Sequence, residues 1–241
     1  MKTLTIDIGN TSIKYAVFNG QTMVHHQRII GHDIASIADD IATYRPAHAM
    51  VCATAALDDT QRRLLEELTA DTWFLSHTTP NPINNQYKSP QTLGMDRLAA
   101  AVGAYSAARG EVLIIDMGTA ITYDFVDTDG NYVGGNIAPG VQMRLRALHD
   151  YTARLPLVDA EGERPPLGED TETAIRCGVI DGIKYEIEGY LHHFFLKYPN
   201  LSVFFTGGDE LYFANERKKR IFADKMLVLK GLNEILSYNL R

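Results

Sequence analysis

Two short runs of this sequence end an apolar stretch in an aspartate that is followed two residues later by a glycine. In the first run, TLTIDIGNTSIKYAVF, the carboxylate of Asp7 can hold a hydrated cation, while Gly9 lets backbone N–H groups approach phosphate oxygens. The candidate phosphate-binding residues here are Asp7, Gly9, Asn10, Thr11, Ser12 and Lys14, and Asp7 is also a candidate ligand of Mg²⁺ through water. The alternative is a solvent-exposed hairpin turn, because Asp-x-Gly closes many such turns.

A related run, VLIIDMGTAITYDFV, returns much later in the chain with Asp116, Gly118 and Thr119. We expect Asp116 to hold a cation near the phosphates and Thr119 to contact ATP. Asp124 follows Thr122 by two residues, so both side chains share one face of a strand, and the role of Asp124 stays open. Two copies of the pattern predict a duplicated fold of two similar lobes with nucleotide bound in a cleft between them. The chain contains no GxxxxGK[ST], which excludes a Walker P-loop.

An acid of a different kind is Asp96, which lies where a polar loop passes into a predicted helix. The first turn of a helix favours the charged form of a carboxylate. Phosphoryl transfer to an alcohol needs a base that accepts the hydroxyl proton, and Asp96 is the candidate. Arg97 beside it offers a guanidinium fork suited to a carboxylate or phosphate. The alternative for this pair is helix capping with a surface ion pair.

A third glycine element, Gly207-Gly208-Asp209, again ends a predicted strand. In a two-lobed nucleotide-binding fold, such a turn brings backbone close to adenosine. Asp209 is a candidate cap for a following helix. A Gly-Gly turn by itself is weakly specific, so an ordinary turn stays open as the alternative.

Composition excludes several classes of protein. The formal net charge is -7 over 241 residues, which disfavours nucleic acid as a partner, and the basic run at 217–220 is interpreted as a solvated surface. Cys52 and Cys177 stand far apart without metal-ligand spacing, so we expect reduced thiols and a cytoplasmic protein. The histidines have no spacing typical of a metal site. No apolar run approaches the length needed to span a membrane.

Apolar spacing predicts α/β architecture, with strands and helices alternating in two similar blocks. Strands are predicted at 2–8, 13–18, 23–30, 48–53, 73–75, 111–117, 120–127, 131–137 and 201–206. Helices are predicted near 33–44, 59–69 and 95–109, after residue 140, over 171–197 as a long amphipathic helix, and from about 231. Polar, proline-rich segments at 78–92 and 156–170 are expected to be loops. The N-terminal lobe should comprise residues 1–109 and the C-terminal lobe residues 110–241, each a mixed sheet with flanking helices.

Taken together and in order, these motifs resemble the type III pantothenate kinase family of the actin-like (ribonuclease-H-like), sugar-kinase-like ATPases. The resemblance covers essentially the full length. It is carried by DIGNTSIK at 7–14, Tyr87, GMDR at 94–97, DMGTAITYD at 116–124, GGNIAPG at 134–140, TARLP at 152–156, Thr171 and TGGD at 206–209. One departure is Arg176-Cys177, where members more often carry Gln-Ser.

The resemblance implies an ATP-dependent kinase that phosphorylates pantothenate in the first step of coenzyme A biosynthesis. By position, it implies that the 7–14 turn and Thr119 bind ATP, that Asp96 accepts the proton, and that Asp116 binds potassium or ammonium. It also implies that Mg²⁺ is required and that the protein is a homodimer. The residues implied to contact pantothenate are Tyr87, Gly94, Met95, Asp96, Arg97 and Thr171.

Two other functions stay open at this point. One is a sugar or N-acetylhexosamine kinase on the same scaffold. The other is a non-catalytic accessory protein of transcription, against which the intact set of Asp7, Asp96 and Asp116 and the acidic net charge both argue.

Overall fold

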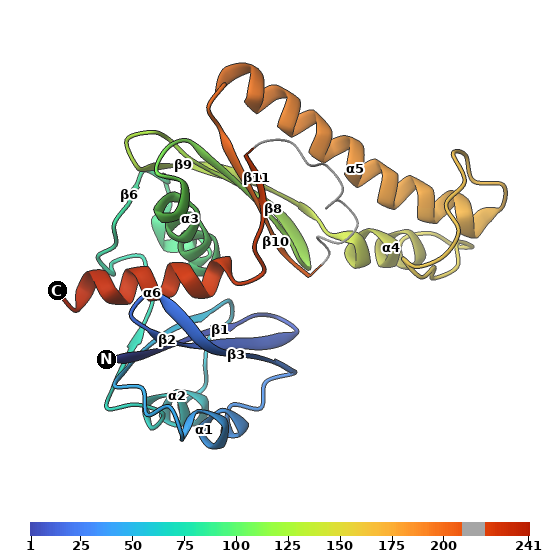
Figure 1. Ribbon diagram of the computed structural model, residues 1–241. Helices are drawn as coiled ribbons and strands as arrows, with labels where there is room; N and C mark the ends of the chain where they lie inside the picture. The colour runs from blue at the N-terminus through green and yellow to red at the C-terminus, as the bar shows by residue number, and fades with distance from the viewer. Residues whose placement is uncertain (209–219) are drawn as a thin grey trace. The chain divides into compact units, whose positions relative to one another are not determined.

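The computed structural model describes residues 1–208 and 220–241, which form two compact units (Figure 1). Unit 1 consists of Met1–Val112, Asp124–Gly134 and Met226–Arg241, and unit 2 of Leu113–Tyr123 and Gly135–Lys225. Each unit therefore draws on segments far apart in the sequence. A division into lobes at residues 109 and 110 stays a prediction. Asp209 and residues 217–219 lie outside the described residues.

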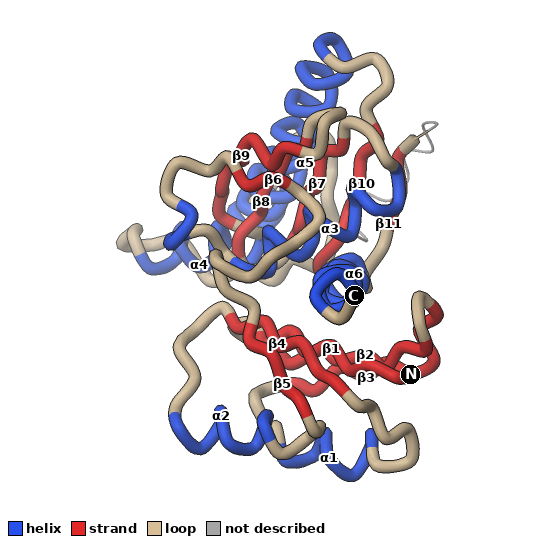
Figure 2. The backbone as a smooth tube through the Cα atoms, turned by 90° about the vertical axis from the view of Figure 1, so that its left-hand side faces the viewer, coloured by secondary structure: helices blue, strands red, loops and turns tan. Residues whose placement is uncertain are grey.

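The first sheet belongs to unit 1 and contains five strands in the order β3-β2-β1-β4-β5 (Figure 2). These strands are β1 (Lys2–Ile8), β2 (Ser12–Asn19), β3 (Thr22–Ile30), β4 (His48–Ala53) and β5 (Asp71–Phe74). The first three pair antiparallel, whereas β4 runs parallel to β1 and β5 runs parallel to β4. The sheet is therefore mixed, as predicted.

Alternation along β1 divides its side chains between two faces of this sheet. Leu4, Ile6 and Ile8 belong to a buried apolar cluster that also holds residues of α1 (Ala35–Ile41) and α2 (Asp59–Glu66). The other face carries the buried polar residues Thr3 and Asp7. The strand sequence TLTIDI thus sends a carboxylate away from the apolar core, toward the face on which α6 (Leu227–Asn239) packs.

Two helices of unit 1 complete that polar face. Gly103 of α3 (Met95–Ala108) and Gly231 of α6 allow the closest contact between the two helices, because a Cβ on Gly231 would lie 1.8 Å from a backbone oxygen of α3. On the other side of α6, the amide oxygen of Asn233 accepts a hydrogen bond from the Thr3 hydroxyl at 2.7 Å. The C-terminal helix is thereby joined to both the first strand and α3.

The second sheet contains six strands in the order β11-β10-β7-β8-β9-β6. They are β6 (Asn84–Asn85), β7 (Val112–Met117), β8 (Ala120–Val126), β9 (Asn131–Pro139), β10 (Ser202–Gly207) and β11 (Ile221–Ala223). Unit 2 also holds α4 (Val141–Asp150) and α5 (Thr171–Lys197), which run beside each other in Figure 1. Buried residues of α5 recur at helical spacing, as in Ile175, Val179, Ile183 and Ile187, so one side of this helix faces the unit.

Four elements differ from the prediction. The segment expected to be a loop at 78–92 contains the strand β6 and a 3₁₀ turn at Pro90–Thr92, and the strand β11 was not predicted. The terminal helix begins at Leu227, earlier than expected. Both missed strands are too short to show a periodic pattern, and their pairing partners lie elsewhere in the chain.

Candidate functional site

A row of four side chains crosses the first sheet. Cα pairing places Asp7 opposite Lys14 on one side and Cys52 on the other, and Lys14 opposite Arg28. Partners in register project from the same face, so a carboxylate, an ammonium and a guanidinium lie side by side. Exposure falls along the row from exposed Arg28, through half-buried Lys14, to Asp7 at 8% and Cys52 at 0%. The row brings a solvent-accessible positive charge to one side of a buried acid.

The turn at 9–12 joins β1 and β2, the two strands that carry Asp7 and Lys14 of this row. Its closing hydrogen bond runs from the Gly9 N–H to the Ser12 carbonyl at 3.0 Å. Arg28 donates from Nε to the Ser12 hydroxyl at 3.2 Å, and Thr54 donates to the side-chain oxygen of Asn10 at 3.4 Å. Asn10 and its neighbour Thr11 are exposed. The sequence-predicted phosphate residues of unit 1 therefore gather at one loop beside two cations.

Asp96 lies in the first turn of α3, and its Oδ1 accepts the backbone N–H of Arg97 at 2.9 Å. A Cβ on Gly94 would lie 2.5 Å from that same oxygen, so only glycine leaves the carboxylate in place. Burial raises the pKa of Asp96, and the charge of Asp124 raises it further, whereas Arg97 opposes the increase. A carboxylate with a raised pKa is a stronger base than an exposed aspartate.

Cys52, the fully buried residue of the charged row, is influenced by both Asp7 and Asp96. Burial raises the pKa of the Cys52 thiol, and the charges of Asp7 and Asp96 raise it further. Both carboxylates therefore act on one buried thiol, which places the two predicted acids of unit 1 in one neighbourhood. The thiol stays protonated there.

Arg97 is buried rather than presented to solvent. Its side chain is 7% exposed and faces Asp124, which is 1% exposed. The Arg97 Nε and Nη2 groups donate to Asp124 Oδ1 at 3.0 and 2.6 Å. The hydroxyl of Tyr132 donates to the same oxygen at 2.6 Å. One edge of the guanidinium fork predicted for a ligand is thus occupied by a carboxylate of the protein.

Tyr87 closes this cluster on another side. The Arg97 guanidinium carbon lies 5.9 Å from the centre of the Tyr87 ring, and Tyr87 meets Tyr132 edge-on at 6.1 Å. Asn85 accepts the backbone N–H of Tyr87 at 3.0 Å, which fixes the chain after β6. The predicted substrate residues of unit 1 therefore form one cluster around the start of α3.

The second acidic turn, in unit 2, is enclosed by backbone. Asp116 is half-buried near the end of β7, and Thr119 is exposed. A Cβ on Gly140 would lie 2.6 Å from the Thr119 carbonyl oxygen, and one on Gly207 would lie 2.4 Å from the Met117 carbonyl oxygen. Gly140 of the GGNIAPG motif and Gly207 at the end of β10 thus both lie against the backbone of the DMGT turn. Only glycines permit so close an approach of three backbone segments.

Both predicted cation ligands supply only oxygen. Within residues 1–208 and 220–241, no group of three or more His, Cys, Asp or Glu side chains is placed to hold a metal ion. A divalent ion at Asp7 would therefore take most of its ligands from water and phosphate, as Mg²⁺ commonly does. At Gly118, a Cβ would lie 3.8 Å from both Asp116 Oδ1 and the Ala120 carbonyl oxygen. Carboxylate and carbonyl oxygens are the kinds of donor that a hard cation prefers.

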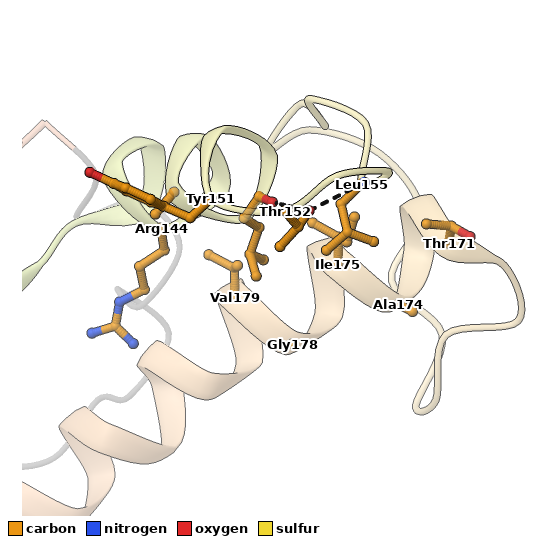
Figure 3. A pocket seen from close by; sticks show the side chains of 11 residues that line it. Arg144, Tyr151, Thr152, Leu155, Thr171, Ala174, Ile175, Gly178 and Val179 are labelled. Atoms are coloured by element: carbon orange, nitrogen blue, oxygen red, sulfur yellow. Dashed lines mark hydrogen bonds between the residues drawn. The ribbon is translucent and has the colours of Figure 1, made fainter.

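Thr171 begins α5 and lines a cavity of about 840 Å³ in unit 2. The cavity lies along α4 and α5, with apolar side chains such as Ile175 and Val179 on its wall (Figure 3). Arg144 lies at the opposite end from Thr171, and its Nη2 donates to Glu186 at 2.6 Å. Thr171 therefore belongs to unit 2 together with Asp116 and Thr119, and the other predicted site residues belong to unit 1.

Sequence reasoning missed several residues of these clusters. Arg28 was not singled out because only strand pairing brings it beside Lys14. Cys52 was interpreted as an ordinary thiol, and Tyr132 carried no local signal. The role of Asp124 was left open, and its carboxylate is buried against Arg97. A charged residue inside an apolar strand such as TYDFV was the available sign of a buried partner.

No helix among the described residues is long and apolar enough to cross a membrane. Solved structures with a similar fold include two whose names refer to a nucleotide. An activator of 2-hydroxyisocaproyl-CoA dehydratase from Clostridium difficile with bound ADPNP superposes with a TM-score of 0.53 at 11% identity, covering 100% of this chain and 97% of that one. The inorganic polyphosphate/ATP-glucomannokinase of an Arthrobacter strain gives 0.50 at 16% identity, with 99% and 98% covered. These likenesses confirm the predicted actin-like α/β fold of sugar kinases and ATPases.

Sequence comparison is more specific. The family model of type III pantothenate kinase matches residues 3–193. A type III pantothenate kinase from Phocaeicola vulgatus is 49% identical over 237 residues, which is 98% of each chain. Since match and coverage extend over both acidic turns and the loop before α3, this chain belongs to the type III pantothenate kinase family.

Proposed function

We propose that this protein transfers the γ-phosphoryl group of ATP to the primary hydroxyl of pantothenate, the first step of coenzyme A biosynthesis. Membership of the family, at 49% identity over 98% of the chain, is the observation that carries the proposal. The grouping of Asp7, Lys14 and Asp96 in unit 1 supports it, because phosphoryl transfer requires phosphate binding and a base in one place.

In this proposal, Asp96 accepts the hydroxyl proton as the alcohol oxygen attacks the γ-phosphorus and the bond to the bridging oxygen of ADP breaks. Burial of Asp96 supports the role, because a raised pKa increases the proton affinity of the carboxylate. The hydrogen bond from the Arg97 N–H holds one oxygen, Oδ1. The second oxygen, Oδ2, is then the natural proton acceptor.

Phosphate binding is assigned to Asp7, Gly9, Asn10, Thr11, Ser12 and Lys14, together with Thr119 of the second turn. The ammonium of Lys14 neutralises part of the triphosphate charge, and backbone N–H groups of the 9–12 turn supply donors. Mg²⁺ bound through water at Asp7 would supply further charge neutralisation. Asp116 would hold potassium or ammonium, because a carboxylate supplies oxygen donors to such an ion.

Pantothenate contacts are assigned to Tyr87, to Gly94, Met95, Asp96 and Arg97, and to Thr171. Within unit 1 these residues surround the start of α3, where a bound alcohol would meet Asp96. The Nε–Nη2 edge of Arg97 is held by Asp124, so a pantothenate carboxylate would meet the remaining part of the guanidinium.

We assign a homodimeric state as well. The family resemblance favours it, and α5 leaves large apolar side chains in solvent, with Tyr185 68% exposed and Leu196 72% exposed. Light scattering coupled to gel filtration should give twice the mass of the chain. Leu196→Glu should shift the protein toward the monomer, and a monomeric wild type would contradict the assignment.

A coupled ATPase assay tests the proposed activity directly. ADP release should depend on pantothenate and should be stimulated by potassium, whereas glucose, N-acetylmannosamine and glycerol should give no turnover at low concentration. Mass spectrometry should identify a phosphate ester of pantothenate as the product. Turnover with a sugar and none with pantothenate would show that the protein is a sugar kinase instead.

A further inference from the structure

A buried ion pair lies directly behind the proposed base. Arg97 follows Asp96 in the first turn of α3 and is held by Asp124, a residue with no assigned role. Asp124 accepts from two guanidinium nitrogens and from the Tyr132 hydroxyl, each at 3.2 Å or less. A carboxylate that is 1% exposed and satisfied in this way holds its partner in a single orientation.

Three strands and a helix are needed to build this arrangement. Asp124 lies on β8, Tyr132 on β9, and β6 pairs with β9 at Tyr132 through Asn85. All of these residues belong to unit 1, although β8 and β9 begin or end in unit 2. The ion pair therefore connects the start of α3 to the part of the second sheet that belongs to unit 1.

We propose that Asp124, oriented by Tyr132, is a positioning residue that fixes Arg97 and thereby sets the orientation and charge environment of Asp96. The inference rests on the proposed phosphoryl transfer and deepens it. Arg97 acts on Asp96 in two ways, through its backbone N–H on Oδ1 and through its charge. Both depend on where the Arg97 side chain and backbone are held, and Asp124 holds the side chain.

The charges around Asp96 determine whether its pKa should rise or fall when Asp124 is replaced. Burial raises the pKa of Asp96, and the negative charge of Asp124 raises it further, whereas Arg97 lowers it. The neighbouring Cys52 stays a neutral thiol. Replacing Asp124 by an uncharged amide removes the negative charge and leaves the positive one. The pKa of Asp96 should therefore fall, and the acid limb of the kcat profile should move to lower pH.

Asp124→Asn is the primary variant. We expect kcat to fall by about tenfold to a hundredfold, since a small misplacement of reacting groups has effects of this size. The KM for ATP should stay unchanged, and the acid limb should shift as described. Tyr132→Phe keeps both charges of the pair, so it should lower kcat by only about threefold and leave the acid limb where it is.

A matched control is Asp127→Asn, which removes a carboxylate from the turn that follows β8. In the described contacts, the Asp127 carboxylate accepts hydrogen bonds only from Asp129 and Asn131. This variant should keep the kinetic constants and the pH profile of the wild type. Thermal unfolding of every variant separates loss of folded protein from loss of turnover.

A folded Asp124→Asn protein with wild-type kcat and an unmoved acid limb would overturn the inference, because a merely structural pair would affect stability alone. If Asp124→Asn does not fold, Tyr132→Phe becomes the deciding variant. An unchanged kcat in Tyr132→Phe would then overturn the inference. A wild-type protein that is inactive on pantothenate would instead refute the proposed function. The kinetic measurement on the wild type detects that outcome before any variant is compared.

Discussion

The two acidic glycine turns have similar sequences but different surroundings. Asp7 lies in a row with Lys14 and Arg28, so the first turn combines a carboxylate with two cations. The second turn, DMGT, contains no lysine or arginine and is instead enclosed by the backbone of two other glycine motifs. A repeated pattern in the sequence therefore does not imply repeated chemistry. Strand partners decide the charge of one turn, and close backbone packing decides the shape of the other.

The largest expected effect distinguishes the proposed base of unit 1 from the proposed cation ligand of unit 2. Asp96→Asn should lower kcat by at least about a hundredfold, the scale of a lost general base, while ATP still binds. Asp116→Asn is the matched acid in the other unit, and it should abolish stimulation by potassium and leave the residual turnover measurable. Steady-state kinetics with and without potassium would check both. Near-normal turnover of Asp96→Asn would reject the base.

Glycine substitutions can test whether the second acidic turn is packed more closely by backbone than the first. A Cβ on Gly140 would lie 2.2 Å from the Gly118 carbonyl oxygen, so Gly140→Ala should lower the free energy of unfolding by about 1–3 kcal/mol or more. A Cβ on Gly9 would lie 3.4 Å from the Ser12 carbonyl oxygen, and Gly9→Ala should therefore cost much less. Urea denaturation measures the difference. Equal losses would show that the two turns are packed alike.

The charge half of the comparison concerns ATP affinity. Lys14→Ala removes a charged donor and should raise the KM for ATP by about tenfold, whereas Thr119→Ala removes a neutral hydroxyl and should raise it by about threefold. Titration of ATP at saturating pantothenate would compare the two variants. A larger effect from Thr119 than from Lys14 would reverse the roles assigned to the turns.

The smallest effect is expected at the exposed end of the charged row. Arg28→Ala should raise the KM for ATP by about twofold to threefold, because a solvent-exposed charge contributes little. Added salt should reduce the difference from the wild type, since the contribution is electrostatic. Arg28→Lys, which keeps the charge, serves as the control. A salt-independent loss would indicate that Arg28 acts through its hydrogen bond to Ser12 instead.

Local sequence patterns sufficed for much of this protein. Alternating apolar residues marked β1 and its neighbours, helical spacing marked α3 and α5, and the turn residues located both acidic glycine turns. The start of α3 placed Asp96 in a first helical turn. These features follow from the two-residue and 3.6-residue periods of strand and helix, which any short segment records in its own residues.

Pairings between distant segments were decided only by the tertiary structure. Asn233 and Thr3 are 230 residues apart, and Arg97 and Asp124 are 27 apart, yet each pair is buried and hydrogen-bonded. The same holds for β6, whose two residues are a strand only because β9 lies beside them. Such contacts depend on which surfaces meet after folding, so one segment of sequence carries no record of its partner. The residues that could act were therefore visible in the sequence, and the neighbours that orient and charge them were not.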